Sequence, residues 1–151
     1  MSTRCQIGIY EDKDAKLENW EVLLYKHSDG YPGKEDGSKH GILPDIIPFL
    51  KRFDGKRGIG DVEYCGAWLM HHLIEQHIEK AKEMAEKFDH VPRNGKDFMG
   101  YGICKQLSED ISYFYKIYPS GIDVYEVSFD TPPREWIRIK RILLKKKRKR
   151  V

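Results

Sequence analysis

Apolar and polar residues alternate in two segments near the N-terminus, residues 5 to 10 and residues 20 to 27. Side chains of a strand point alternately to its two faces, so both segments predict strands with one buried face. The charged residues between them favour a hairpin connection. Residues 27 to 41 contain four glycines and have no apolar period. They predict a long surface loop, and loops of this length are often functional.

Two helices are predicted after this loop. Apolar residues recur at helical spacing between Leu43 and Phe53, where Pro48 would shorten or bend a short helix. Asp61 is a suitable N-cap for a second, long helix. We expect the apolar stripe of this long helix to be its buried face. The stripe consists of Tyr64, Trp68, His71, Ile74, Ile78, Ala81, Ala85 and Phe88.

The last third of the chain predicts further strands. Residues 111 to 117 and 122 to 129 flank a Tyr-Pro-Ser-Gly turn, which favours a hairpin, and residues 101 to 104 can add a strand. Residues 132 to 144 fit either a helix or a strand with alternating isoleucines, and we interpret them as a helix. The predicted fold class is α+β, an antiparallel sheet of about four to five strands packed against one long helix and a short helix.

The length of 151 residues and the 40% of hydrophobic residues indicate one domain with a packed core. Three widely spaced cysteines fit a reducing compartment, and the apolar runs fall short of the ~20 residues that cross a bilayer. We therefore expect a soluble, cytoplasmic protein with no membrane partner. His71 and Glu75 can supply two metal ligands, but no third ligand can be placed, so we predict neither a metal nor a cofactor.

Positive charge is concentrated at the C-terminus. The whole chain has a net charge of +3, and the nine cations of residues 138 to 151 leave −6 on residues 1 to 137. We therefore expect a single α+β domain over 1–137 and a basic segment over 138–151. Six consecutive cations are expected to bind nucleic acid without sequence preference, or to act as a solubilising tail that can fold back on the acidic body. In a eukaryotic host they also resemble a nuclear import signal. They are Lys145, Lys146, Lys147, Arg148, Lys149 and Arg150.

Candidate chemistry is concentrated where the second predicted strand ends. His27 and Asp29 lie two residues apart at this strand end, which would point both side chains the same way, with Tyr31 close by. Such a group can do acid–base work or hold a polar ligand, although Asp-Gly also favours a simple turn. Lys56 and Arg57 precede the long helix in a glycine-containing segment. They can meet a phosphate there, or the segment is only a flexible connector.

A resemblance is carried by Thr3-Arg4 before the first strand and by His27-Ser28-Asp29-Gly30-Tyr31-Pro32 after the second. Together they resemble a group of small uncharacterised proteins of phages and prokaryotes, in which a Thr-Arg start accompanies a His-x-Asp-Gly-Tyr motif. The resemblance covers about the first third of the chain. It departs at Ser28, where an aromatic residue is often found, and in a longer charged insertion over 33–41. It implies a phage-related context and, as site positions, His27 and Asp29.

Two functions remain open from the sequence. The leading hypothesis is a small accessory or host-interaction binding module whose loop after residue 27 recognises a protein or small-molecule partner, with the basic tail contacting nucleic acid. The alternative is a hydrolase or phosphoesterase, in which His27 is the acid or base, Asp29 orients it, and Lys56 or Arg57 meets a phosphate.

Overall fold

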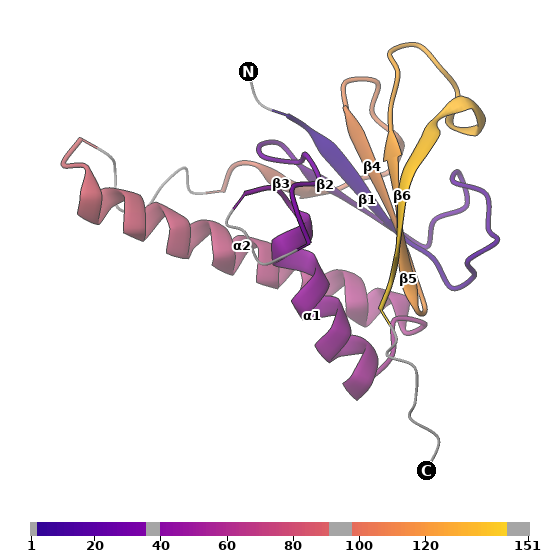
Figure 1. The fold of residues 1–151 in the computed structure, drawn as a ribbon, viewed down its shortest axis with the longest axis horizontal. Helices are drawn as coiled ribbons and strands as arrows, with labels where there is room; N and C mark the ends of the chain where they lie inside the picture. The colour runs from indigo at the N-terminus through magenta and orange to yellow at the C-terminus, as the bar shows by residue number, and fades with distance from the viewer. Residues whose placement is uncertain (1–2, 36–39, 91–97, 145–151) are drawn as a thin grey trace.

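The computed structural model describes residues 3–35, 40–90 and 98–144. They form an α+β fold in which two helices cover one face of a six-stranded sheet (Figure 1). Within these ranges, no helix combines the length and the apolar character needed to cross a membrane. The elements are β1 (Cys5–Ile9), β2 (Val22–Lys26), α1 (Leu43–Lys56), α2 (Val62–Lys87), β3 (Tyr101–Ile103), β4 (Tyr113–Tyr118), β5 (Gly121–Glu126), a 3₁₀ turn (Pro133–Glu135) and β6 (Ile137–Leu143).

The sheet has the order β3-β2-β1-β4-β5-β6 and is mixed. Strands β1 and β4 run parallel, with Ile7 opposite Tyr115, whereas the other neighbouring strands are antiparallel. The expectation of four to five strands is therefore wrong in number, and the expected antiparallel direction is wrong for the β1–β4 pair alone. Parallel neighbours need a long crossover, and α1, α2 and β3 all lie between these two strands in the sequence. Local alternation carries no information about such a distant pairing.

The segment from 132 to 144 is a strand, so its interpretation as a helix is wrong. Only the 3₁₀ turn forms at the prolines, and β6 then pairs with β5 along its whole length, with a bulge at Val124/Tyr125. The β-branched residues Ile137, Ile139 and Ile142 suit this extended conformation. The expected domain boundary at residue 138 falls inside β6. The basic residues Arg138, Lys140 and Arg141 thus belong to the sheet.

Two apolar clusters lie on the two faces of the sheet. The larger one is enclosed by α1 and α2 and includes Ile7, Leu24 and Tyr115. The smaller one lies on the opposite face, where Tyr10, Phe114 and Trp136 pack with residues of the loop between β1 and β2. Because apolar clusters lie on both faces, the strands have apolar residues that point to either side of the sheet.

The buried face of α2 differs from the predicted stripe. Val62, Cys65, Leu69 and Leu73 are buried, whereas Tyr64 and Trp68 are 50% and 56% exposed, and the other large apolar side chains of the stripe are exposed as well. Gly66 faces β2, and a Cβ atom there would lie 2.7 Å from a methyl carbon of Val22. The helix can approach the sheet closely only on this side, which is why the less apolar face is the buried one.

Candidate functional site

A pocket of about 480 Å³ lies where the β2–β3 ladder ends beside α2. Its lining comes from the end of β2 and the turn after it, from α2, and from β3 and the residues before β3. A second hollow of about 370 Å³ lies between the loop before β4 and the 3₁₀ turn, on the other side of the sheet. We consider the first pocket the better candidate site, because it has a buried charged side chain in its lining and contains both His27 and Asp29.

Lys26 is the buried charge in this pocket, with only 7% of the residue exposed. It lies opposite Tyr101 in the β2–β3 ladder and points, like Leu24, to the helix side of the sheet. Its ammonium donates to the carbonyl oxygen of Ser28 and lies 5.6 Å from the centre of the Tyr101 ring. Among the described residues no carboxylate is within ion-pair distance of it. Burial lowers the pKa of Lys26, because desolvation disfavours the charged form.

His77 of α2 faces the same side of the pocket. Its ring meets the Tyr101 ring edge-on, with the centroids 5.5 Å apart. Its Nε2 atom is buried and has no hydrogen-bond partner among the described residues. A buried polar atom without a hydrogen-bond partner lowers the stability of the folded state by about 1–3 kcal/mol. Burial also raises the pKa of Tyr101 to about 12, so its hydroxyl stays protonated at neutral pH.

The side chain of His27 points to the face of the sheet opposite to that of Lys26, because successive residues of an extended chain point to alternate faces. The Nδ1 atom of His27 lies 3.1 Å from the hydroxyl of Tyr25 and 3.4 Å from Nε of Arg4, which is a donor only. Nδ1 therefore accepts, and the neutral ring carries its proton on Nε2. Arg4 is fixed in turn by an ion pair with Asp110 at 3.3 Å.

The two parts of the resemblance motif meet in space. The Arg4 side chain donates to His27, and the backbone N–H of Gly30 donates to the carbonyl oxygen of Thr3 at 2.9 Å. Gly30 is packed so tightly that an added Cβ would lie 2.8 Å from Cβ of Cys5. Glycine is therefore required where the turn after β2 crosses the start of β1.

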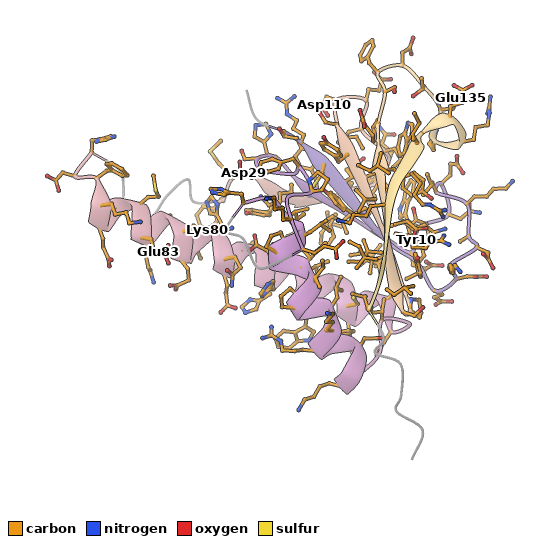
Figure 2. All side chains as sticks on the ribbon, viewed as in Figure 1. Tyr10, Asp29, Lys80, Glu83, Asp110 and Glu135 are labelled. Carbon is orange, nitrogen blue, oxygen red and sulfur yellow. The ribbon has the colours of Figure 1, made fainter. Side chains whose placement is uncertain are left out.

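Asp29 makes no direct hydrogen bond to His27 among the described residues. It has a left-handed backbone conformation, with φ at 57°, which interrupts the alternation that the strand would otherwise continue. Its charge acts on Lys26 and Tyr101, and no ion pair joins it to His27 among the described residues. Figure 2 labels Asp29 and also Asp110, the partner of Arg4. The two sequence candidates thus line one pocket from different sides, and a catalytic role for them stays a prediction.

The other candidates on the body lie outside this pocket. The carbonyl oxygen of Tyr31 accepts from the backbone of Ile42, which anchors the loop to the start of α1. Lys56 and Arg57 are at the C-terminal end of α1. They lie roughly 17 Å along the helix from Asp45, a first-turn residue whose charge acts on Lys26. Arg57 pairs with Asp61 at 2.6 Å and stacks 3.7 Å from the centre of the Tyr64 ring.

The basic residues Lys145 to Arg150 lie outside the described residues. Over the described ranges no group of three or more His, Cys, Asp or Glu side chains could hold a metal ion. His71 and Glu75 form an exposed pair 3.4 Å apart on α2.

Sequence reasoning missed most members of the pocket, among them Lys26, His77 and Tyr101. A signal did exist for Lys26, because alternation from Leu24 assigns this charged residue to the buried side of its strand. His77 and Tyr101 are far apart in the sequence, and only the packing of α2 beside β3 brings them together.

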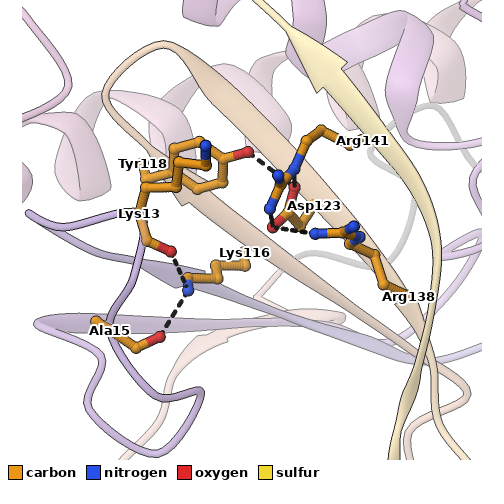
Figure 3. Close-up of polar contacts among 7 residues, drawn as sticks. All are labelled: Lys13, Ala15, Lys116, Tyr118, Asp123, Arg138 and Arg141. Carbon is orange, nitrogen blue, oxygen red and sulfur yellow. Dashed lines mark hydrogen bonds and ion pairs between the residues drawn. The ribbon is translucent and has the colours of Figure 1, made fainter.

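A second buried charge cluster lies on the open face of the sheet (Figure 3). We call it the Asp123 cluster; it contains Asp123, Tyr118, Arg138 and Arg141. Both carboxylate oxygens of Asp123 accept from Arg141, at 2.8 and 2.9 Å, and one also accepts from the Tyr118 hydroxyl at 2.8 Å. Beside it, the ammonium of Lys116 donates to two carbonyl oxygens of the loop between β1 and β2, both at 2.6 Å. These contacts satisfy the buried charges within the chain.

Burial alone would raise the pKa of Asp123, but the hydrogen bonds from Arg141 and Tyr118 and the charges of Arg141 and Arg138 together hold it below its ordinary value. The cluster therefore ties β4, β5 and β6 together as an ion-paired structural unit.

Comparison of the chain with protein-family models, with curated proteins and with solved structures gives no match. The resemblance to the phage and prokaryotic group thus rests on the Thr-Arg and His-x-Asp-Gly-Tyr residues alone and stays a prediction.

Proposed function

We propose that the protein is a small binding module that holds a small ligand with an anionic group in the pocket beside α2. The observation that carries this proposal is the Lys26 ammonium, which is buried in the pocket lining without a carboxylate partner among the described residues. Burying a charge costs several kcal/mol unless it is paired and hydrogen-bonded. An anion in the pocket would supply the missing pair and would favour the charged form of Lys26.

Two further groups fit such a ligand. The buried Nε2 atom of His77 has no partner among the described residues and can accept or donate a hydrogen bond, depending on its tautomer. Asp29 would repel a bare anion, so it calls for a ligand that also presents hydroxyl or N–H donors. The ligand class that suits the pocket is therefore a polar small molecule with one anionic end and neighbouring donors.

A Lys26→Met variant tests this proposal, because methionine preserves the length of the buried stem without the charge. Wild-type protein is titrated calorimetrically with a panel of small phosphates and carboxylates, and the tightest binder is then titrated into the variants. We expect at least a tenfold loss of affinity in Lys26→Met, or about 1.4 kcal/mol. The matched control is Lys105→Met, which removes an exposed lysine outside the pocket and should bind like wild type. Equal affinity in Lys26→Met and wild type would refute the assignment.

The alternative hydrolase or phosphoesterase has one supporting observation. His27 and Asp29 line the same pocket, so an acid or base and a carboxylate are both within reach of one ligand there. Its expected cations are absent from that pocket, because neither Lys56 nor Arg57 lines it. Lys26 would have to replace them. Turnover of a phosphate monoester that disappears in His27→Ala, with ligand affinity unchanged, would favour this alternative over simple binding.

An accessory or host-interaction role in a phage-related context is part of the same proposal and rests on the motif resemblance alone. The basic residues Lys145 to Arg150 would add a sequence-independent contact with nucleic acid. Removal of residues 145–151 should abolish a salt-sensitive DNA or RNA mobility shift while the thermal midpoint stays nearly constant. A shift that persists after the truncation would exclude this role of the tail.

A further inference from the structure

The pocket has an uncovered apolar wall in addition to its polar residues. Phe98 and Met99 line it, and Phe98 is fully exposed while Met99 is 61% exposed. Phe98 also has a left-handed backbone, with φ at 63°, which is uncommon for a bulky residue. The exposed aromatic ring of Phe98 therefore lies at the edge of the pocket, on a residue whose backbone conformation is uncommon.

The order of these residues in space follows from the β2–β3 ladder. Lys26 is opposite Tyr101, and the His27 backbone N–H donates to Gly100 at 2.8 Å, so the ladder continues toward Met99 and Phe98 as it leaves the sheet. The buried cation therefore lies at the inner end of the pocket and the apolar wall at its outer end. Asp29 follows Lys26 by three residues and acts electrostatically on it.

We infer that the ligand is a nucleoside phosphate, an inference that rests on the proposed function. The phosphate is held by Lys26, the sugar hydroxyls donate to Asp29, and the base stacks on Phe98 and Met99. A carboxylate is a common acceptor for ribose hydroxyls, and aromatic side chains bind bases of any sequence through their π-faces. A pocket of about 480 Å³ is in the size range of small-molecule sites. No simpler anion uses all three parts of the lining.

The test compares adenosine, cytidine, guanosine and uridine 5′-monophosphates with ribose 5-phosphate, which has the same phosphate and sugar but no base. Stacking of the base on an aromatic residue adds to the affinity, so the tightest nucleotide should bind roughly tenfold or more tightly than ribose 5-phosphate. In Phe98→Ala this advantage should largely disappear, while the affinity for ribose 5-phosphate stays constant.

Asp29 is tested with the 2′,3′-dideoxy form of the tightest nucleotide. We expect it to bind several-fold more weakly than the parent nucleotide in wild type and equally in Asp29→Gly, which removes the accepting side chain and suits the left-handed backbone at this position. Phe98 is fully exposed and Asp29 lies in a surface turn, so both variants should fold, which circular dichroism checks.

The outcomes separate this inference from the proposed function. If ribose 5-phosphate binds as tightly as all four nucleotides and depends on Lys26, the anion pocket stands and the nucleotide assignment is wrong. If neither nucleotides nor inorganic phosphate nor the other small anions bind, both are wrong. A 5′-phosphorylated trinucleotide distinguishes the source: tighter binding than the mononucleotide, with the same dependence on Phe98, identifies a strand end, and weaker binding identifies a free nucleotide.

Discussion

The Asp123 cluster and the Lys26 pocket both bury a charged side chain against the same sheet, but within the described residues only the charge of Asp123 is paired with an opposite charge. Asp123 is 1% exposed and accepts hydrogen bonds from Tyr118 and twice from Arg141. Lys26 is nearly as buried, yet it has one carbonyl oxygen and one aromatic ring as neighbours. A charge that is paired within the chain stabilises the fold, whereas a charge left in a cavity without its counterion indicates a binding site.

The largest expected effect comes from breaking the paired cluster. Asp123→Ala leaves the Tyr118 hydroxyl and the partly exposed Arg141 guanidinium without their acceptor, and we expect a loss of about 2 kcal/mol in the free energy of unfolding, measured with urea. Glu126→Ala on the same strand is the control; its side chain is exposed, so its effect should stay within about 0.5 kcal/mol. Similar values for the two variants would mean that the cluster is not a structural unit.

A smaller effect of opposite sign is expected at the pocket. Lys26→Met removes an unpaired buried charge and replaces it with an apolar side chain of similar length. Such replacements are neutral or stabilising, so the free energy of unfolding should stay constant or rise by about 1 kcal/mol while ligand binding is lost. A loss of 2 kcal/mol or more, by the same urea titration, would assign Lys26 a structural role and remove the contrast with Asp123.

The smallest effect is a pH dependence. The pKa of Asp123 is lower in the folded chain than in the unfolded one, so the unfolded state binds more protons as the pH falls. The stabilisation by this carboxylate is complete above the unfolded pKa, about 3.9, and is lost as the pH falls through the lower folded value. Asp123→Asn should therefore lose less stability than wild type as the pH falls below about 4, which urea titrations at several pH values would measure. Parallel curves would contradict the prediction.

Local patterns in the sequence predict the elements of this fold well, but not how they meet. The hairpins, both helices and the strand before residue 104 follow from alternation and helical spacing, and the structure contains them. The parallel β1–β4 pairing joins residues about a hundred positions apart and leaves no local trace. β6 was ambiguous because its isoleucines fit either conformation, and pairing with β5 decides between them.

The candidate site shows the same division. The prediction of a site at His27 to Asp29 falls on residues that line the pocket, because residues at a strand end next to a glycine turn tend to be accessible. The sequence pattern suggests that His27 and Asp29 point the same way. The structure differs, because the left-handed backbone of Asp29 interrupts the alternation of the strand. On α2, helical periodicity fits two faces, the predicted stripe and the face that is buried in the structure, and does not say which of them packs on the sheet. Tyr64 and Trp68 are larger than Cys65 and Gly66, yet the small residues are the ones that let the helix approach β2.

The parallel pairing of β1 and β4 also governs when the protein can fold. During synthesis β1 and β2 can form their hairpin early, but the other edge of β1 has no partner until residues 113 to 118 have been made. Contacts this distant in sequence make folding slow, and an unpaired strand edge invites pairing with other chains. A nascent chain halted before β4 would therefore carry an open, apolar edge in the middle of its future sheet. Shielding of that edge by a chaperone would be most valuable at this stage of translation.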